Sequence, residues 1–545
     1  MKIIQRIIFY LKAGFLFSSL LFAQLLMSQS SPFKVSLEEV VIPELGGIQS
    51  YAFGRHEGQW LIVGGRLDGL HRRQPFAAFD LAGHNNRLVV IDPEHKQKWS
   101  ASITSLPASI QAQLSSTNME FIQVGIYLYV IGGYGYSPAI GDHTTYAFLT
   151  AIHVEKVIEA VQEGKEITPY FRQIEDNNFQ VTGGSLKMIE DTFYLLGGQK
   201  FLGRYNPMGP NHGPGFIQEY TNEVRRFHLS DDGSTIKITH LPAFRDAEKL
   251  HRRDYNAESQ IMPDGSQGIT MFSGVFRPNV DLPFLDAVNV DKNGYSVQQG
   301  FEQYYNHYHC ASIPLFSTEH KEMHTLFFGG IAQYYENKGK LVKDDNAPFV
   351  KTIARLTRDS LGVMREFKLT QEMPALLGAG SEFIPVNELP VFANGVLDLD
   401  ALPEEKSLIG YIFGGISSTA ANIFFTNDGS QSKASPTIFK VFLENTHGSG
   451  TDVLNVYSAR NIALEVFPNP NSGQFVIRYY LHSNEDVVLS IVDESGKNLL
   501  HQSLKKQAIG ENTYTADLSD NLTKGIYFVT ILTTNGSGSA KVIIR

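Results

Sequence analysis

Apolar runs that end at a pair of glycines recur along the chain. The first is the run from Trp60 to Val63, which is followed by Gly64 and Gly65. Similar runs end at Gly132-Gly133, Gly197-Gly198, Ser273-Gly274, Gly329-Gly330 and Gly414-Gly415, with serine replacing one glycine in the third of these. Short apolar runs that stop at glycine predict β-strands. Their return at intervals of several tens of residues predicts an array of similar β-units.

Each unit is predicted to contain four strands. In the first unit they lie near residues 49–54, at the run ending in Gly65, at 87–92 and around 98–100, with a tight turn at 56–58. The third strands of the later units are expected at residues 147–153, 223–227, 287–290, 352–356 and 437–443. Repeated four-stranded units of this length are typical of the blades of a β-propeller.

The sixth unit shows no fourth strand before the Gly/Ser-rich stretch at residues 447–451. A β-like run at residues 37–42 stands unused ahead of the first unit. Pairing this run with the sixth unit would close the array and remove exposed strand edges, which otherwise invite aggregation. We therefore expect an N-terminal strand to complete the last unit.

The repeats resemble the kelch repeat, whose signatures are the double glycine and a later tryptophan. Trp99 stands at the tryptophan position of the first unit, whereas Ser273 departs from the double glycine. The resemblance covers residues 34–444 and implies an all-β fold, a six-bladed kelch-type β-propeller. A phosphate-binding loop is the rival interpretation of a glycine pair, but no Gly-x-Gly-x-x-Gly followed by a helix occurs.

The character of the chain changes after a linker at residues 445–460. Short β-runs at residues 474–480, 487–493, 525–531 and 540–545 predict a small β-sandwich over residues 461–545. This segment resembles the C-terminal sorting domain of the type IX secretion system of Bacteroidetes. The matching features are Phe467-Pro468-Asn469-Pro470, the turn at 493–496, residues 518–522 before Gly525-Ile526-Tyr527, and the terminal run from Lys541 to Arg545. The resemblance implies interaction with that machinery, followed by release or attachment to surface polysaccharide.

The N-terminus has the order of a secretory signal peptide, which we assign to residues 1–30. Lys2, Arg6 and Lys12 precede an apolar run at residues 13–27, and small polar residues follow. A membrane anchor is the alternative, but the apolar core of about 15 residues is shorter than the roughly 20 that span a bilayer. Both ends of the chain therefore predict export through the periplasm to the medium or the outer-membrane cell surface, with no transmembrane segment after cleavage.

Composition excludes some partners. The formal net charge of −10 argues against nucleic acid and anionic membranes, which reward clustered lysine and arginine. Cys310 is the only cysteine, so no internal disulfide can form and stability must come from packing.

Long loops follow the glycine pairs, and antiparallel alternation places them on the same face as the segments that lead into the first strands. The strands of a propeller surround a central channel. We expect the ligand site at the mouth of this channel on the face with the long loops, because long loops on a rigid scaffold commonly bind ligands. The ligand-binding candidates are Glu120, Arg252, Arg253, Asp254, Tyr255, His307, Tyr308, His309 and Glu382. Loop residues that add donors and aromatic faces are His71, Arg72, Arg73, Tyr134, Tyr136, His143, Arg204, Tyr205 and His212. Arginine pairs with anions and tyrosine stacks on sugar rings, so the predicted function is recognition of an extracellular glycan or protein. The alternative is a ring of polar residues that bond to one another.

Metal binding and catalysis stay open as alternatives. His307 and His309 would share a face if they lay in a strand, but a zinc or copper site needs at least one more ligand. No cofactor is predicted, with copper and calcium left as open alternatives. Kelch propellers include copper-radical oxidases similar to galactose oxidase, and Tyr308-His309 resembles their adjacent tyrosine-histidine pair. Cys310, however, lies in the same segment, whereas that family takes its crosslinking cysteine from another blade. A hydrolase with Asp254 or Glu120 as acid or base is the other enzymatic alternative.

Overall fold

The structure is a computed structural model that describes residues 31–74, 76–208, 215–403, 405–445, 455–456, 460–481, 484–493, 498–518, 524–533 and 536–545. The predicted signal peptide, His212, most of the linker, the turn at 494–497 and residues 519–522 lie outside the described residues. The described chain is built mainly of β-strands, so the all-β prediction is confirmed.

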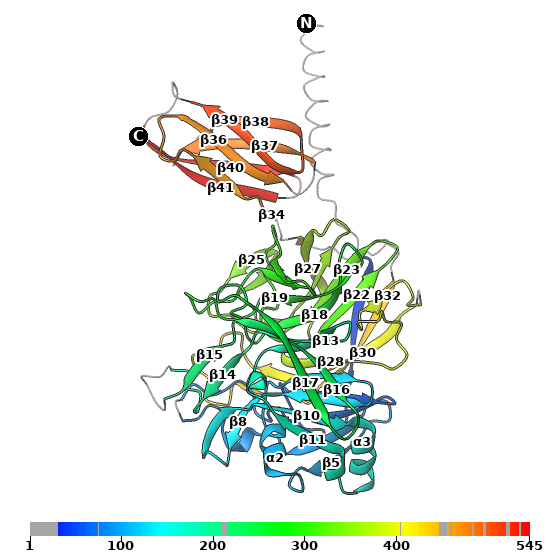
Figure 1. Cartoon of the computed structure of the whole chain (residues 1–545). Helices are drawn as coiled ribbons and strands as arrows, with labels where there is room; N and C mark the ends of the chain where they lie inside the picture. Colours follow the sequence, from blue (N-terminus) through cyan, green and yellow to red (C-terminus); the bar gives the residue numbers. More distant parts are fainter. Residues whose placement is uncertain are drawn as a thin grey trace.

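Six sheets, each built on four antiparallel strands, follow one another along residues 33–445 (Figure 1). The first sheet contains β2 (Ala52–His56), β3 (Gln59–Val63), β4 (Arg87–Asp92) and β5 (Gln97–Ser102). The second contains β6 (Glu120–Val124), β7 (Tyr127–Ile131), β10 (Phe148–His153) and β11 (Phe171–Glu175). The third contains β12 (Ser185–Ile189), β13 (Thr192–Leu196), β16 (Glu223–Asp231) and β17 (Ile236–Arg245).

The remaining three sheets repeat the pattern. The fourth contains β18 (Asn256–Ile261), β19 (Gln267–Phe272), β20 (Ala287–Val290) and β21 (Tyr295–Val297). The fifth contains β22 (Ser312–Ser317), β23 (Glu322–Phe328), β26 (Thr352–Arg358) and β27 (Met364–Glu372), extended by β29 (Leu397–Asp398) and β33 (Asn455–Val456). The sixth contains β28 (Leu376–Pro385), β30 (Ser407–Ser418), β32 (Ile438–Asn445) and β1 (Phe33–Val40), with β31 (Ser432–Ala434) beside β30.

Neighbouring sheets in the sequence are also neighbours in space. The first strands contact one another in the order β2, β6, β12, β18, β22 and β28. The sixth sheet then returns to the first, because the Gly415 amide donates to the Ile48 carbonyl at 2.9 Å and the Ser50 amide donates to the Gly380 carbonyl at 2.8 Å. The Tyr51 hydroxyl also donates to the Phe413 carbonyl, at 3.0 Å. The contacts therefore link all six sheets in sequence and connect the last to the first.

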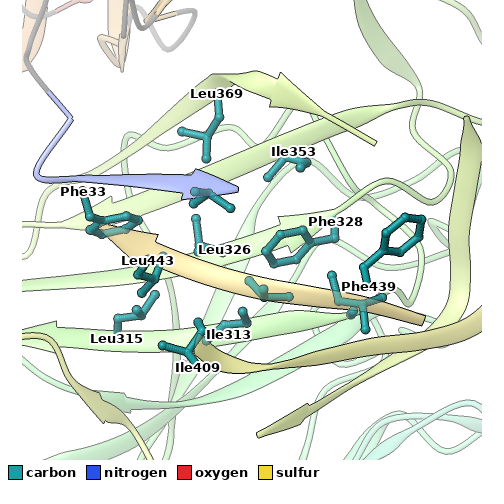
Figure 2. Packing of buried hydrophobic residues seen from close by; sticks show 14 of the residues in the cluster. Phe33, Ile313, Leu315, Leu326, Phe328, Ile353, Leu369, Ile409, Phe439 and Leu443 are labelled. Atoms are coloured by element: carbon teal, nitrogen blue, oxygen red, sulfur yellow. The ribbon is translucent and has the colours of Figure 1, made fainter. Parts of the chain in front are cut away.

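The N-terminal strand β1 completes the sixth sheet, as the sequence predicted. It pairs with β32 over its whole length, from Phe33 opposite Asn445 to Val40 opposite Ile438. The strand begins earlier than the predicted run at residues 37–42, because Phe33 and Val35 are buried apolar residues that extend it. Figure 2 shows Phe33 packed in the core cluster that contains Leu326 and Leu443.

Short strands occupy segments that were expected to be loops. One further sheet is formed by β8 (Tyr134–Ser137), β9 (Asp142–Thr145), β14 (Gln199–Leu202) and β15 (Ile217–Tyr220), and a hairpin by β24 (Tyr334–Asn337) and β25 (Lys340–Lys343). The sheet joins the segments that follow two different glycine pairs, so its pairing was not visible in either segment alone. These segments therefore contain paired strands where loops were expected.

In the described residues, two short helices and three 3₁₀ turns interrupt the strands. The helices are α2 (Ala108–Leu114) and α3 (Val154–Glu163), and the turns are η1 (Leu81–Gly83), η2 (Thr168–Tyr170) and η3 (Asn177–Phe179). Helix α3 buries Val154, Val157 and Val161 against strands of the first sheet. It ends at Gly164, whose φ of 68° continues into a left-handed turn. The helix therefore covers one side of the first sheet.

The C-terminal segment forms two sheets. One contains β34 (Arg460–Asn461), β41 (Gly536–Ile544), β40 (Gly525–Thr533), β37 (Glu485–Asp493) and β38 (Asn498–Gln507), and the other β35 (Leu464–Phe467), β36 (Gln474–Leu481) and β39 (Gly510–Asp517). Ile477 of β36, Leu489 of β37 and Val529 of β40 belong to one buried cluster, so the two sheets pack as a sandwich. Strands β38 and β39 were not predicted, because they are rich in polar residues.

Five of the pairs directly follow the end of a strand, whereas Gly414 and Gly415 lie inside β30, so the predicted stop is wrong for the sixth unit. At these pairs the backbone of the next sheet is close. A Cβ atom on Gly329 would lie 2.1 Å from the Leu377 carbonyl oxygen, and one on Gly132 would lie 2.0 Å from the Val181 carbonyl oxygen. The amides of the next glycines donate to the same two carbonyls: Gly330 to Leu377 at 2.8 Å and Gly133 to Val181 at 2.9 Å. The pairs therefore join neighbouring sheets through the backbone, which agrees with a structural role.

Replacing Gly329 by alanine should destabilise the protein much more than the same change at Gly141. Both residues have a left-handed φ, 65° and 68°, but a Cβ on Gly141 meets nothing within 4 Å. Gly141→Ala should cost about 1 to 2 kcal/mol for the backbone conformation alone. Gly329→Ala adds a clash with backbone. Urea unfolding of both variants measures the difference, and equal losses of free energy would contradict the role assigned to the pairs.

Removal of residues 33–40 should lower the melting temperature sharply, because it exposes the edge of β32 and the core beneath it. Phe33→Ala should cost about 3 kcal/mol or more, since the ring is 1% exposed. Val41→Ala is the control, because Val41 lies just beyond β1 and is 64% exposed. Thermal unfolding of the three variants gives the comparison, and an unchanged melting curve after the deletion would show that β1 is dispensable.

Candidate functional site

A cavity of about 980 Å³ lies along the first strands of all six sheets. Ser50, Asn118 and Asp254 line it where the chain leads into these strands, and Arg55 and Asn387 line it at the other end. Side chains alternate between the two faces of a strand, so one set from each first strand meets around this space. The volume is within the range of small-molecule sites in proteins.

Six acidic side chains line the cavity. Glu190 and Glu388 are exposed, and three of the other four are paired with a cation. Glu258 of β18 lies 2.8 Å from Lys187 Nζ, Glu382 of β28 lies 3.1 Å from His309 Nε2, and Asp254 forms an ion pair with Arg253. The Ser312 hydroxyl also donates to Glu258, at 2.6 Å. Lys187 and His309 therefore each have a carboxylate partner in the cavity wall, and Arg55, the third cation of the lining, donates to the Pro385 and Val386 carbonyls.

The fourth acid, Glu120, opens β6 and is 2% exposed. Its Oε1 accepts a hydrogen bond from the Gly184 amide at 2.7 Å. Its Oε2 is buried and has no hydrogen-bond partner in the part of the chain that the structure describes. Burial raises the pKa of Glu120 to about 8, and the charge of Asp254 adds to this, while the Gly184 amide and Arg225 act in the opposite direction. Glu120 is therefore a neutral carboxylic acid at pH 7.

His309 joins three of the sheets. Its amide donates to the Asp254 carbonyl at 3.0 Å, its carbonyl accepts from the Gly380 amide at 2.9 Å, and its ring contacts Glu382. Burial lowers the pKa of His309, but the charge of Glu382 and the hydrogen bond to it outweigh burial, so the net shift is upward. The pair therefore favours an imidazolium beside a carboxylate in the cavity wall.

The structure brings five of the nine predicted site residues together in the cavity lining: Glu120, Asp254, Tyr255, His309 and Glu382. Tyr255 is 2% exposed and donates its hydroxyl hydrogen to the Leu196 carbonyl at 2.8 Å. Glu382 does not open its strand as expected but lies inside β28. These five residues therefore line one common space, along the first strands rather than among the long loops.

Arg252 has a structural position instead. Its side chain is fully buried, its Nη2 lies 2.5 Å from Asp286 Oδ1, and its Nη1 donates to the Ser273 carbonyl at 2.6 Å. The guanidinium also lies over the Phe284 ring, 4.0 Å from its centroid. With no exposed surface, Arg252 holds the segment before β18 and is not placed to contact a ligand.

His307 is likewise part of the core, and the strand assumed for residues 304–310 is absent because β22 begins at Ser312. His307 Nδ1 accepts from the Gln333 amide at 3.0 Å and its Nε2 lies 2.8 Å from the Gln303 carbonyl oxygen, so both ring nitrogens are occupied. Burial lowers its pKa to about 4. His307 and His309 therefore have different partners, and the shared face assumed for a metal pair does not form. Among the described residues, no group of three or more His, Cys, Asp and Glu side chains could hold a metal ion.

The residues on the glycine-pair face bond mainly to one another. Arg204 Nη2 lies 2.5 Å from Asp80 Oδ1, and the Tyr134 hydroxyl donates to the Gly203 carbonyl at 2.8 Å. Among the described residues, the lining of the cavity includes none from the loop segments at 66–86, 134–146, 199–208, 215–222 and 331–350. On this face, polar side chains therefore bond to other side chains and to backbone carbonyls.

Arg253 and Tyr308 belong to the same face and also lie outside the cavity lining. Arg253 Nε donates to the Tyr220 hydroxyl at 3.1 Å, and its guanidinium lies over the Phe276 ring at 5.0 Å. The Tyr308 ring contacts the same Phe276 ring edge-on, with centroids 6.4 Å apart. These two residues therefore form an aromatic and cationic cluster beside the cavity, joined to it through Asp254.

Several lining residues were missed. Lys187, Glu258, Arg55 and Gln123 lie on the first strands, and three rings add apolar surface: Phe53, Phe121 and Phe383. The sequence held a usable signal, because alternation along each first strand selects Lys187 with Ser185 and Glu258 with Asn256. The prediction concentrated instead on the segments before these strands.

Comparison with known proteins identifies the C-terminal segment. Residues 465–545 match the family described as the secretion system C-terminal sorting domain. This domain indicates export through the type IX secretion system, interaction with its machinery, and secretion or attachment at the cell surface. In the part of the chain that the structure describes, no helix is long and apolar enough to cross a membrane.

The search of curated proteins found no match. Among solved structures, one titled "Structure of YjhT" is similar over 71% of this chain and 97% of its own, with 11% sequence identity and a TM-score of 0.40.

Glu382→Gln should lower the pKa of His309, because it removes the negative charge that opposes the effect of burial. A raised pKa stabilises the folded state below the ordinary histidine value of 6.5, and this contribution is lost as pH rises through the folded pKa. The variant should therefore be less stable than the wild type mainly at low pH. NMR titration of the His309 ring measures the shift. An unchanged or higher pKa in the variant would show that Glu382 does not set the charge of His309.

Proposed function

We propose that this exported chain recognises a neutral, hydroxyl-rich ligand, a glycan, in the cavity along the first strands. The observation that carries the proposal is the convergence of polar side chains from different sheets on one space of about 980 Å³. In the same proposal, residues 33–445 form a six-bladed β-propeller of kelch type, and the cavity is its axial channel. Six consecutive four-stranded sheets, glycine pairs at their contacts and bonds between the first and last sheets support that architecture.

The pairing of the cations in the lining favours a neutral ligand over an anionic one. The cations Lys187 and His309 each contact a carboxylate in the cavity wall, at 2.8 and 3.1 Å. Paired carboxylates still have lone pairs that accept hydrogen bonds from hydroxyl groups. An anionic ligand would compete with carboxylates for these cations.

The apolar part of the lining suits a sugar ring. Phe53, Phe121 and Phe383 come from β2, β6 and β28 and are each partly exposed. The first two rings lie edge to face, with centroids 5.3 Å apart. A sugar offers C–H faces to such rings while its hydroxyls reach polar groups. A folded protein partner could not enter a space of this size, so a glycan is favoured over a protein ligand.

Recognition is also favoured over hydrolysis. Glycoside hydrolysis uses one carboxylic acid and a second carboxylate as base or nucleophile. Glu120 has the protonation of an acid, but Asp254, Glu258 and Glu382 are each paired with a cation. These three carboxylates are held by their partners in the wall, and the two remaining acids of the lining, Glu190 and Glu388, are exposed. No second carboxylate is therefore placed beside Glu120 as an unpaired base within the buried part of the lining that the structure describes.

A glycan array probed with the purified wild-type chain, followed by calorimetry of the best neutral hit, tests the proposal. Lys187→Met should weaken binding at least about fivefold, because it removes a charged donor from the cavity. Lys200→Met is the matched control. Lys187 and Lys200 are 25% and 27% exposed and have ion pairs of 2.8 and 2.6 Å, but Lys200 lies on β14, outside the lining.

Binding by Lys200→Met should equal that of the wild type within about twofold. If the wild type binds no glycan, or if both variants lose affinity equally, the cavity is not the recognition site.

A further inference from the structure

The carboxyl group of Glu120 stands apart from the other acids of the cavity. It is 98% buried in the wall, with Oε1 held by the Gly184 amide and Oε2 without a partner among the described residues. A buried polar atom that lacks a hydrogen bond is costly, commonly by about 1 to 3 kcal/mol. Such an atom calls for an explanation, and a ligand group or a water molecule that completes its bonding would supply one.

The surroundings of Glu120 favour its uncharged form. Asp254 repels a negative charge at this position, and burial removes water from it, whereas Arg225 attracts the charge. The charged or titratable groups that interact with Glu120 are Asp254, Arg225 and Tyr255. The strands in contact with β6 also carry Arg55 and His56 on β2, Lys187 on β12, and Tyr127 and Tyr129 on β7. Lys187 is held by Glu258 and Arg55 donates to the Pro385 carbonyl at 2.9 Å, so neither cation forms an ion pair with Glu120.

We propose that Glu120 is a protonated carboxylic acid whose Oε2–H donates a hydrogen bond to an acceptor oxygen of the ligand in the cavity. This inference rests on the proposed function and deepens it. A neutral carboxyl in an apolar wall is a strong donor and selects an ether, carbonyl or hydroxyl oxygen, all of which neutral sugars provide. It also disfavours a ligand that offers only donors. Glu120 is thus a specificity-determining residue of the cavity.

Glu366 supplies the internal comparison. It is 1% exposed on β27, and burial raises its pKa to about 8, as for Glu120. Both of its oxygens, however, accept backbone hydrogen bonds, from the amides of Tyr304 at 2.6 Å and Tyr305 at 3.1 Å. Glu366 is not among the residues that line the cavity. Glu120 therefore differs from Glu366 in two ways: its Oε2 has no partner among the described residues, and it lines the cavity. The raised pKa is common to both.

The test measures binding and protonation in the same full-length proteins. The probes are neutral sugars: glucose, galactose, mannose, N-acetylglucosamine, lactose and cellobiose. Calorimetry of the wild type, Glu120→Gln, Glu120→Ala and the control Glu366→Gln is carried out at pH 6.5 and pH 9.5, with circular dichroism to confirm folding. Infrared difference spectra of wild type against Glu120→Gln report the carbonyl band of a protonated carboxyl group at each pH.

We expect the wild-type affinity for the bound sugar to fall at least about tenfold from pH 6.5 to pH 9.5, as Glu120 ionises and loses its donor. Glu120→Gln keeps a donor at every pH, so its affinity should stay within about threefold of wild type at pH 6.5 and lose this pH dependence. Glu120→Ala should bind weakly at both pH values. Glu366→Gln should keep the wild-type pH dependence. The infrared band removed by Glu120→Gln should be present at pH 6.5 and absent at pH 9.5.

Two results overturn the inference alone: sugar binding with no such infrared band at pH 6.5, or a folded Glu120→Gln that binds as weakly as Glu120→Ala. Failure of every sugar to bind the wild type overturns the proposed function, and with it the role of Glu120 as donor to a sugar, even if the infrared band is present. The two failures are therefore distinguished by the wild-type binding measurement.

Discussion

The close approach of backbone between neighbouring sheets is the constraint on which the other features depend. At Gly132 and Gly329 the next sheet lies so near that a single Cβ would overlap a carbonyl oxygen. Backbone hydrogen bonds from the following glycines cross the same boundaries, to Val181 and Leu377. Neighbouring sheets are therefore linked by directional bonds at their inner ends as well as by apolar packing farther out. The spacing of the first strands, and hence the width of the cavity between them, follows from this contact.

The last sheet also depends on a second contact, which is more distant in the sequence. Strand β1 supplies the outer strand of the sixth sheet, and Phe33 and Val35 enter the cluster shared with β22, β23 and β26 of the fifth sheet. The first and sixth sheets are in turn joined by the bonds of Ile48 and Ser50. The N-terminal segment thus stabilises both neighbours of the last sheet. In a solenoid the first and last units would not contact each other, and the bonds between these two sheets favour a closed arrangement.

Much of the fold could be predicted because one local signal, an apolar run stopped by a glycine pair, recurs in all six units. In the fourth unit, where Ser273 stands in place of the first glycine, β19 still ends directly before it, at Phe272. Elements that depend on distant partners were not predictable. Strand β9 pairs with β14 across two units, and the polar strands β38 and β39 show little apolar alternation. Helix α3 was not predicted, because a pattern with a period of two does not detect the helical spacing of its buried residues Val154, Val157 and Val161.

The candidate site was only half predictable, for a related reason. Polar residues before a first strand can turn into the cavity, as His309 does, or into the core, as Arg252 and His307 do, and their residue types do not distinguish the two cases. The distinction comes from partners far away in sequence, such as Glu382 for His309 and Asp286 for Arg252. Alternation along the first strands was the better guide, because it depends only on backbone geometry and selects Lys187 and Glu258 directly.

Placing the proposed site on first strands rather than loops links recognition to the integrity of the whole array. Lys187, Glu258 and Glu382 belong to the third, fourth and sixth sheets, so their relative positions are set by every contact between these sheets. Arg55 of the first sheet donates to the Pro385 and Val386 carbonyls, at 2.9 and 3.0 Å, and thereby fixes the end of β28 that follows Glu382. A ligand that bonds to several of these residues would stabilise the folded protein by mass action, since it binds the folded array and not the unfolded chain. A change that destabilises the outer strand β1 should therefore also disturb the cavity, because β1 is connected to the lining through β32, β30 and β28. No lining residue needs to be altered for this effect.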